Sequence, residues 1–184
     1  MSIEAKAGNP AQAQLAYWLF LLADIAFIPG ILGLYLALKE INKSAMLIAT
    51  AWLAFFYVLD LVISELNTLV LITLTQSYAS ASSEVLRAAY QAAEAWGLAT
   101  LPIGTFFSWI GPSSAYVIVT IVMLKSAFGR YTAFLGLIVN ALGIVCSIYF
   151  LHPILILILF QTPVLILYGI WLIATGRRLF KLGR

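Results

Sequence analysis

Long apolar runs, unbroken by charge, constrain the fold of this chain more than any other feature. The run from Leu151 to Leu172 is apolar on all sides and exceeds the roughly 20 residues that a spanning helix needs. Strands of membrane barrels are shorter and alternate in hydrophobicity. Only 9% of the residues are charged, against roughly 25% in soluble domains. The sequence therefore predicts an all-α polytopic transmembrane helical bundle.

Five segments are long enough to cross a bilayer, within a bundle over residues 15–176. They cover about 15–38, 45–75, 98–124, 131–151 and 153–175. The last two are divided at His152-Pro153, because one continuous helix would be roughly 65 Å long, about twice the hydrocarbon thickness. The first segment has no signal-peptide pattern and is expected to stay as an uncleaved helix. A polar N-terminal tail (1–14) and a basic C-terminal tail (177–184) flank the bundle.

Residues 82–96 are too polar to span. Ser82 or Ser83 is placed to cap a helix, with Glu84 in the first turn. Glu84, Arg87, Gln91 and Glu94 follow at helical spacing and make one polar stripe. We expect a separate amphipathic helix at the membrane surface.

The basic residues predict the orientation. Five crossings place eight of the ten on one side: Lys39, Lys43, Lys125, Arg130, Arg177, Arg178, Lys181 and Arg184. Only Lys6 and Arg87 fall on the other. The basic side is expected to be cytoplasmic, so the N-terminus lies outside a plasma membrane. Because orientation explains these charges, they do not indicate a nucleic-acid partner.

Acidic residues inside the spans are the strongest candidates for function. Asp24 and Asp60 lie near the middle of the first and second spans, and Glu65 lies further outward. A charge at the bilayer centre costs about 2.5–3.5 kcal/mol, and no Lys or Arg lies deep in any span. Each acid is therefore protonated, hydrated, bound to a cation, or paired with another chain. The neutral alternative, an interhelical hydrogen-bond donor, needs no ligand.

Helical spacing extends this candidate site. Tyr57, Asp60, Ser64 and Asn67 fall on one face of the second span, whereas Glu65 points away from Asp60. A tight turn joins the first two spans, which places Asp24 at a depth similar to that of Asp60 or Glu65. The candidate intramembrane polar or ion site comprises Asp24, Asp60, Glu65, Ser64 and Asn67.

Other residues support structural interpretations. His152 is the only histidine, so a metal site there requires Glu65 or Asp24 as well, and no cofactor is predicted. Gly136, Asn140 and Gly143 share one helix face and favour close helix packing. Aromatic residues toward the segment ends fit belts at the membrane interfaces: Trp18, Trp96, Trp109, Tyr131 and Trp171.

Three stretches resemble small multi-pass membrane families of bacteria and archaea known only as domains of unknown function. They are Phe27 to Leu34, Lys125 to Tyr131 and Trp171 to Leu179. The resemblance implies the same membrane topology and no activity.

Three functions are compatible with these patterns. The first expectation is a non-enzymatic accessory or structural membrane component, acting as a homo-oligomer or with a partner subunit. The alternatives are a small proton- or cation-coupled transporter or channel that uses Asp60 and Asp24, and a membrane enzyme with Glu65, Asp24 and His152. Serine-nucleophile, zinc-protease and nucleotide-binding motifs are missing from the sequence.

Overall fold

Five helices in the structure are long and apolar enough to cross a membrane. The computed structural model describes residues 10–152 and 155–183, and within them every regular element is a helix. In order, the elements are α2 (Pro10–Leu38), α3 (Lys43–Asp60), the π-helix η1 (Leu61–Glu65), α4 (Leu66–Ala79), α5 (Glu84–Met123), α6 (Arg130–Ser147), the 3₁₀ turn η2 (Ile148–Phe150) and α7 (Leu155–Leu182). The predicted all-α class and the five long apolar helices are confirmed.

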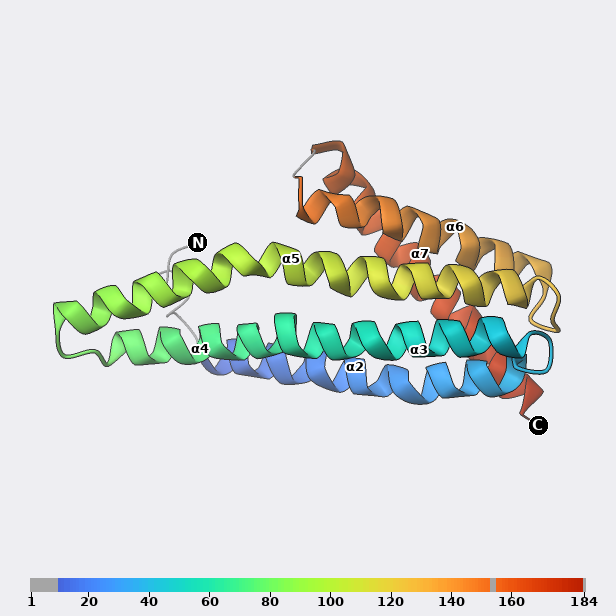
Figure 1. The fold of residues 1–184 in the computed structure, drawn as a ribbon, viewed down its shortest axis with the longest axis horizontal. Helices are drawn as coiled ribbons and strands as arrows, with labels where there is room; N and C mark the ends of the chain where they lie inside the picture. Colours follow the sequence, from blue (N-terminus) through green and yellow to red (C-terminus); the bar gives the residue numbers. More distant parts are fainter. Residues whose placement is uncertain (1–9, 153–154, 184) are drawn as a thin grey trace.

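Helix α5 is the centre of the bundle. It lies between α3 and α4 on one side and α6 on the other, and α7 crosses behind it toward the C-terminal end of α2 (Figure 1). Trp52 of α3 donates an indole hydrogen bond to Ser114 of α5 at 2.8 Å. Between α2 and α7, Gly33 contacts Leu179 closely. The long diagonal of α7 thus brings residues near the C-terminus against the first helix.

The predicted break between residues 96 and 98 is absent. Helix α5 continues through Gly97 and Pro102 over 40 residues, which corresponds to roughly 60 Å. Gly97 is a site of close approach to Leu71 of α4, and membrane helices tolerate proline where neighbours satisfy the freed backbone group. Residues 84–96 are therefore the start of a long helix and not a separate surface helix.

Two other boundaries differ from the prediction. Helix α2 begins at Pro10, inside the predicted polar tail, with proline in its favoured first-turn position. Helix α7 continues to Leu182 through the predicted basic tail. Residues 1–9, 153–154 and 184 lie outside the described part of the structure. Most of the predicted N-terminal tail and Pro153 of the predicted His152-Pro153 turn therefore cannot be compared with the prediction.

The buried core lies toward the end of the bundle where α2 and α3 are joined. Its largest fully buried side chains are Trp171, Tyr116 and Phe128. Gly136 of α6 lies directly beside Trp171, and Gly143 lies beside Ser113 of α5. The predicted close helix approach at these glycines is confirmed.

Two of the expected interfacial aromatic residues are internal. Trp171 is completely buried in the core and Trp109 lines a cavity. Trp18, Trp96 and Tyr131 are exposed, as an aromatic belt requires. A tryptophan near the end of an apolar helix can face either the bundle or the lipid, and its position in the sequence does not show which.

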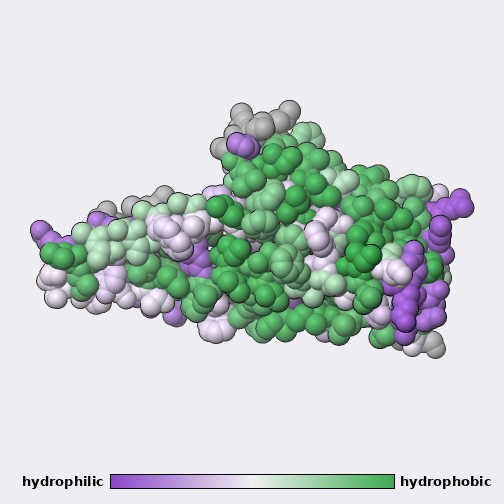
Figure 2. Space-filling model, viewed as in Figure 1, coloured by the Kyte–Doolittle hydropathy of each residue, from purple (hydrophilic) through white to green (hydrophobic). Residues whose placement is uncertain are grey.

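Hydrophilic residues gather at the two ends of the molecule. Figure 2 shows a hydrophobic body, a hydrophilic end at the right, and a paler arm at the left. The right end carries the turns α2–α3 and α5–α6 and the end of α7 (Figure 1). The arm is formed by α4 and the first part of α5.

Candidate functional site

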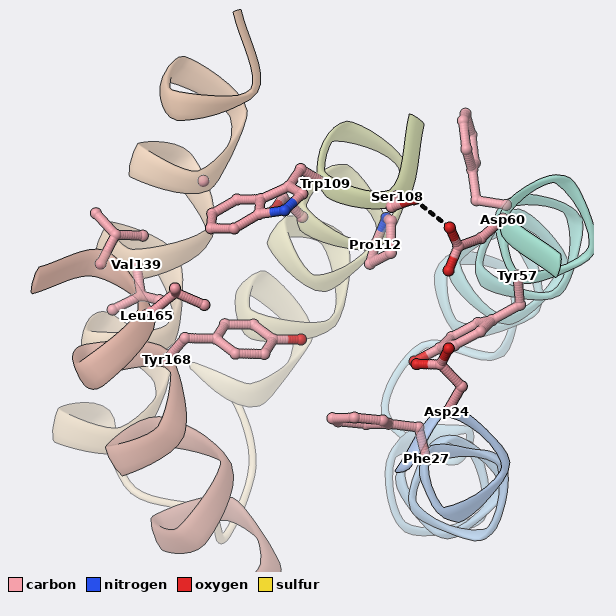
Figure 3. Close-up of a pocket in the computed structure, with 14 residues that line it drawn as sticks. Asp24, Phe27, Tyr57, Asp60, Ser108, Trp109, Pro112, Val139, Leu165 and Tyr168 are labelled. Carbon is pink, nitrogen blue, oxygen red and sulfur yellow. Dashed lines mark hydrogen bonds between the residues drawn. The ribbon is translucent and has the colours of Figure 1, made fainter. Parts of the chain in front are cut away.

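One cavity of about 170 Å³ lies next to the core and contains both aspartates of the candidate site. Asp24 comes from α2 and Asp60 from the last residue of α3. In Figure 3 the two carboxylates lie on the same side of the cavity, with the Tyr57 ring beside Asp24. Asp24, expected at a depth similar to that of Asp60 or Glu65, lines the same cavity as Asp60.

Local sequence explains why this cavity forms where the core ends. Along α3, the fully buried Leu53 is followed by Phe56, Tyr57 and Asp60, so the apolar face becomes polar within two turns. Along α5, Ser108, Trp109 and Pro112 precede the buried Ala115. The cavity therefore occupies the level at which both helices leave the tightly packed core.

Ser108 connects α5 to Asp60. Its hydroxyl donates a hydrogen bond to the Asp60 carboxylate (Figure 3) and also lies 2.9 Å from the carbonyl oxygen of Gly104. A carboxylate that accepts a hydrogen bond from a partly buried hydroxyl is held in one orientation. Ser108 thus directs the Asp60 carboxylate toward the cavity.

Aromatic rings form much of the cavity wall. Phe27, Phe56, Tyr57, Trp109 and Tyr168 all line it. The Phe56 ring packs so closely on Gly111 that a Cβ there would lie 2.0 Å from it. In Figure 3 the hydroxyl of Tyr168 points from α7 toward the side that carries the two aspartates.

No basic side chain compensates these acids from within the cavity. Among the 14 described residues that line it, none is Lys, Arg or His. Two ionised carboxylates in one apolar cavity repel each other and lose hydration. A proton or another cation must therefore reach the cavity from outside this set of residues.

A π-helical turn directly follows Asp60. η1 spans Leu61–Glu65 and places more residues in one turn than an α-helix does. The α-helical spacing that grouped Asp60 with Asn67 is therefore interrupted. Such turns are frequent at functional sites.

Asn67 lies outside the cavity. Its amide donates hydrogen bonds to the carbonyl oxygen of Gly97 at 3.0 Å and to the Thr100 hydroxyl at 3.2 Å. Gly97 and Ser108 are 11 residues apart on α5, about 16 Å along a helix. Asn67 therefore joins α4 to α5 at another level and does not line the cavity that contains Asp60.

The remaining candidates do not extend the site. The side chains of Ser64 and Glu65 lie outside the described residues. His152 is exposed beyond η2 and does not line the cavity. In the described part of the chain, no group of three or more His, Cys, Asp or Glu residues is arranged to hold a metal ion.

Sequence reasoning missed Ser108, Trp109 and Tyr168. Ser108 and Tyr168 each interrupt an apolar stretch near the middle of a helix, which is a usable signal for a polar interior position. Ser108, Trp109 and Tyr168 meet at one cavity because of the way in which α7 crosses α5, and the sequence does not specify that crossing.

Comparison with known proteins adds no constraint on this cavity. No family model matches the chain, and neither a curated protein nor a solved structure matches it. The interpretation of the cavity therefore depends on its own geometry and chemistry.

Proposed function

We propose that this chain is an integral membrane protein of five spanning helices that binds a cation at Asp24 and Asp60 and carries it across the bilayer. The observation that supports this proposal is the convergence of both carboxylates on one cavity without a basic residue in its wall. Acids inside a membrane are rare and commonly mark ion pathways or proton relays. The protein is then a small proton- or cation-coupled transporter.

The exchange of a proton for a cation follows from charge compensation. The two carboxylates have no basic partner among the residues that line the cavity, and an uncompensated charge inside a membrane is costly. A proton and another cation can each supply the missing positive charge, so one can replace the other. Ser108 holds Asp60 in place during this exchange through its hydrogen bond.

The proposed orientation places the basic end of the bundle in the cytoplasm of a plasma-membrane protein. The turn residues Lys39 and Lys125 and the α7 residues Arg177 and Arg178 lie at that end (Figures 1 and 2). An excess of basic residues on the cytoplasmic side is the usual rule for membrane proteins.

Flux in liposomes tests this function. Purified protein is reconstituted with a pH-sensitive dye inside, and inward gradients of sodium, potassium or tetramethylammonium are imposed one at a time. We expect proton movement with at least one cation, and losses of roughly tenfold or more in Asp24→Asn and Asp60→Asn, since each variant removes one of the two carboxylates that would pair with the bound cation.

Glu40→Gln is the matched control, because Glu40 is an exposed acid in the turn between α2 and α3. This variant should keep full flux. Flux that persists unchanged in both aspartate variants would exclude the proposed function.

An accessory role is the second candidate, and the arm formed by α4 and the start of α5 supports it. Val85 is 82% exposed and Trp96 is 71% exposed on this arm. A helix of roughly 60 Å exceeds the hydrocarbon thickness of about 30 Å. If the exposed apolar residues bind a partner subunit, Trp96→Ser should abolish co-purification with that subunit and leave the flux of the isolated chain unchanged.

A further inference from the structure

The cavity has a charged side and an apolar side. Asp24 and Asp60 occupy one side, on α2 and α3, and Val139 and Leu165 occupy the other, on α6 and α7 (Figure 3). The ring of Tyr168 extends between them. A ligand that matches both sides carries positive charge at one end and hydrocarbon at the other.

Inorganic metal ions fit this arrangement poorly. Calcium takes 6–8 oxygen ligands, and potassium filters surround the ion with rings of carbonyl oxygens. Here the two carboxylates and the Ser108 hydroxyl lie toward one side, the Tyr168 hydroxyl points toward them, and aliphatic carbon lines the opposite side (Figure 3). A hard cation would be coordinated from one side of the cavity only.

Organic cations fit the remaining wall. Lysine-like ammonium and quaternary ammonium groups bind the faces of aromatic rings, most strongly when water is excluded. Phe27, Phe56 and Tyr57 come from the same helices as the two acids and supply such rings, whereas the Trp109 ring points toward α6 and α7 (Figure 3). Aromatic rings together with carboxylates are the usual surroundings of a bound quaternary ammonium group.

The volume limits the size of the ligand. The cavity of about 170 Å³ is smaller than the roughly 300–1,000 Å³ of pockets for drug-sized molecules. An ammonium group with a few carbon atoms fits this space.

We propose that the ligand is a small amphipathic organic monocation, an alkylammonium or quaternary ammonium ion. Its charged head lies against Asp24 and Asp60, and its alkyl group lies against Leu165 on the opposite side. This inference rests on the proposed function, because it names the cation that the carrier takes.

Calorimetric titration of the full chain in lipid nanodiscs tests the ligand class. The probes are tetramethylammonium, ethyltrimethylammonium, butyltrimethylammonium, sodium and potassium. We expect binding of the ammonium ions only, with affinity rising up to roughly fourfold for each methylene that becomes buried. Asp24→Asn and Asp60→Asn should weaken ammonium binding roughly tenfold or more.

Two neighbouring residues of α7 provide a matched pair for the apolar side. Leu165 is 52% exposed and Ile166 is 60% exposed, but only Leu165 lines the cavity. Leu165→Phe should weaken butyltrimethylammonium binding more than tetramethylammonium binding, and Ile166→Phe should leave both unchanged. If the aspartate variants do not fold, this pair and the chain-length series still decide the outcome.

The inference and the proposed function fail in different ways. Sodium or potassium binding as tight as ammonium binding, or equal effects of Leu165→Phe and Ile166→Phe, overturns the organic cation. Aspartate-dependent flux that occurs with sodium or potassium but not with ammonium ions also overturns the organic cation, but it leaves the proposed transport function standing. If the chain shows neither ammonium binding nor aspartate-dependent flux, both proposals are wrong.

Discussion

Asp60 and Asn67 illustrate how the same kind of residue acquires different roles. Both lie on the second long helical stretch and both hydrogen-bond to α5. Asn67 finds two acceptors on α5, so its amide is used in packing the arm. Asp60 receives one hydrogen bond from Ser108 and also lines the cavity. A polar residue in an apolar helix becomes a binding group only where its surroundings leave space for a ligand.

Glycine 136 sets the distance between α6 and its neighbours. A Cβ at Gly136 would lie 2.3 Å from Nε1 of Trp171 and 2.5 Å from a methyl group of Thr120. Gly136→Ala should therefore destabilise the fold by about 1–3 kcal/mol, the usual cost of overpacking. Thermal unfolding of the detergent-solubilised protein measures the effect.

Gly169→Ala is the control on α7, because nothing lies within 4 Å of the position that its Cβ would take. Alanine there should be neutral or slightly stabilising, since it favours helix more than glycine does. Equal melting temperatures for the two alanine variants would show that Gly136 is not a close contact.

At the scale of elements, α5 depends on a well-defined start. Ser83 is its N-cap, and the side chain accepts a hydrogen bond from the backbone N–H of Leu86 at 3.3 Å. Glu84 lies in the first turn, where a negative charge is favourable. The predicted cap at Ser82 or Ser83 is thus assigned to Ser83, and the arm turns back at this point.

Ser83→Ala should loosen the first turn of α5, because loss of an N-cap costs about 0.5–2 kcal/mol. Hydrogen exchange of the amides over residues 84–88 should become faster, by up to roughly thirtyfold for the upper end of that range. Ser82→Ala is the neighbouring control and should not change the exchange. Identical protection in the two variants would contradict the assignment of the cap.

At the scale of the molecule, the five helices place the described basic residues other than Arg87 at one end. The turn at Ser82 lies at the end of the arm, and Gly183 lies at the opposite end beside the last turn of α7 (Figure 1). This arrangement agrees with the charge segregation along the sequence. If a bilayer surrounds the hydrophobic body, as we propose, the two ends lie on opposite sides of it.

Cysteine labelling in intact cells checks this topology. In a Cys146→Ser background, Ser82→Cys should react with a membrane-impermeant maleimide from outside, and Gly183→Cys should react only after the membrane is opened. Cys146 is buried, so its replacement by serine should have little effect on labelling. Labelling of both positions from the same side would contradict the five crossings.

The apolar runs and the polar turns between them by themselves determine the helical class and the five long helices. In hydrocarbon a helix satisfies its own backbone hydrogen bonds, so a sufficiently long apolar segment has few other options. The approximate ends of the helices and the cap near Ser83 follow from local sequence for the same reason. Asp24 and Asp60 were identified as candidates because charge is rare in such segments.

Only the tertiary structure decided which side chains meet. The continuity of α5, the π-helical turn after Asp60 and the placing of Tyr168 and Leu165 opposite the aspartates all come from helix packing. When nearly every face of a helix is apolar, hydrophobic periodicity no longer marks the buried side. Close contacts at small residues such as Gly136 then determine the crossing of the helices, and with it the shape of the cavity.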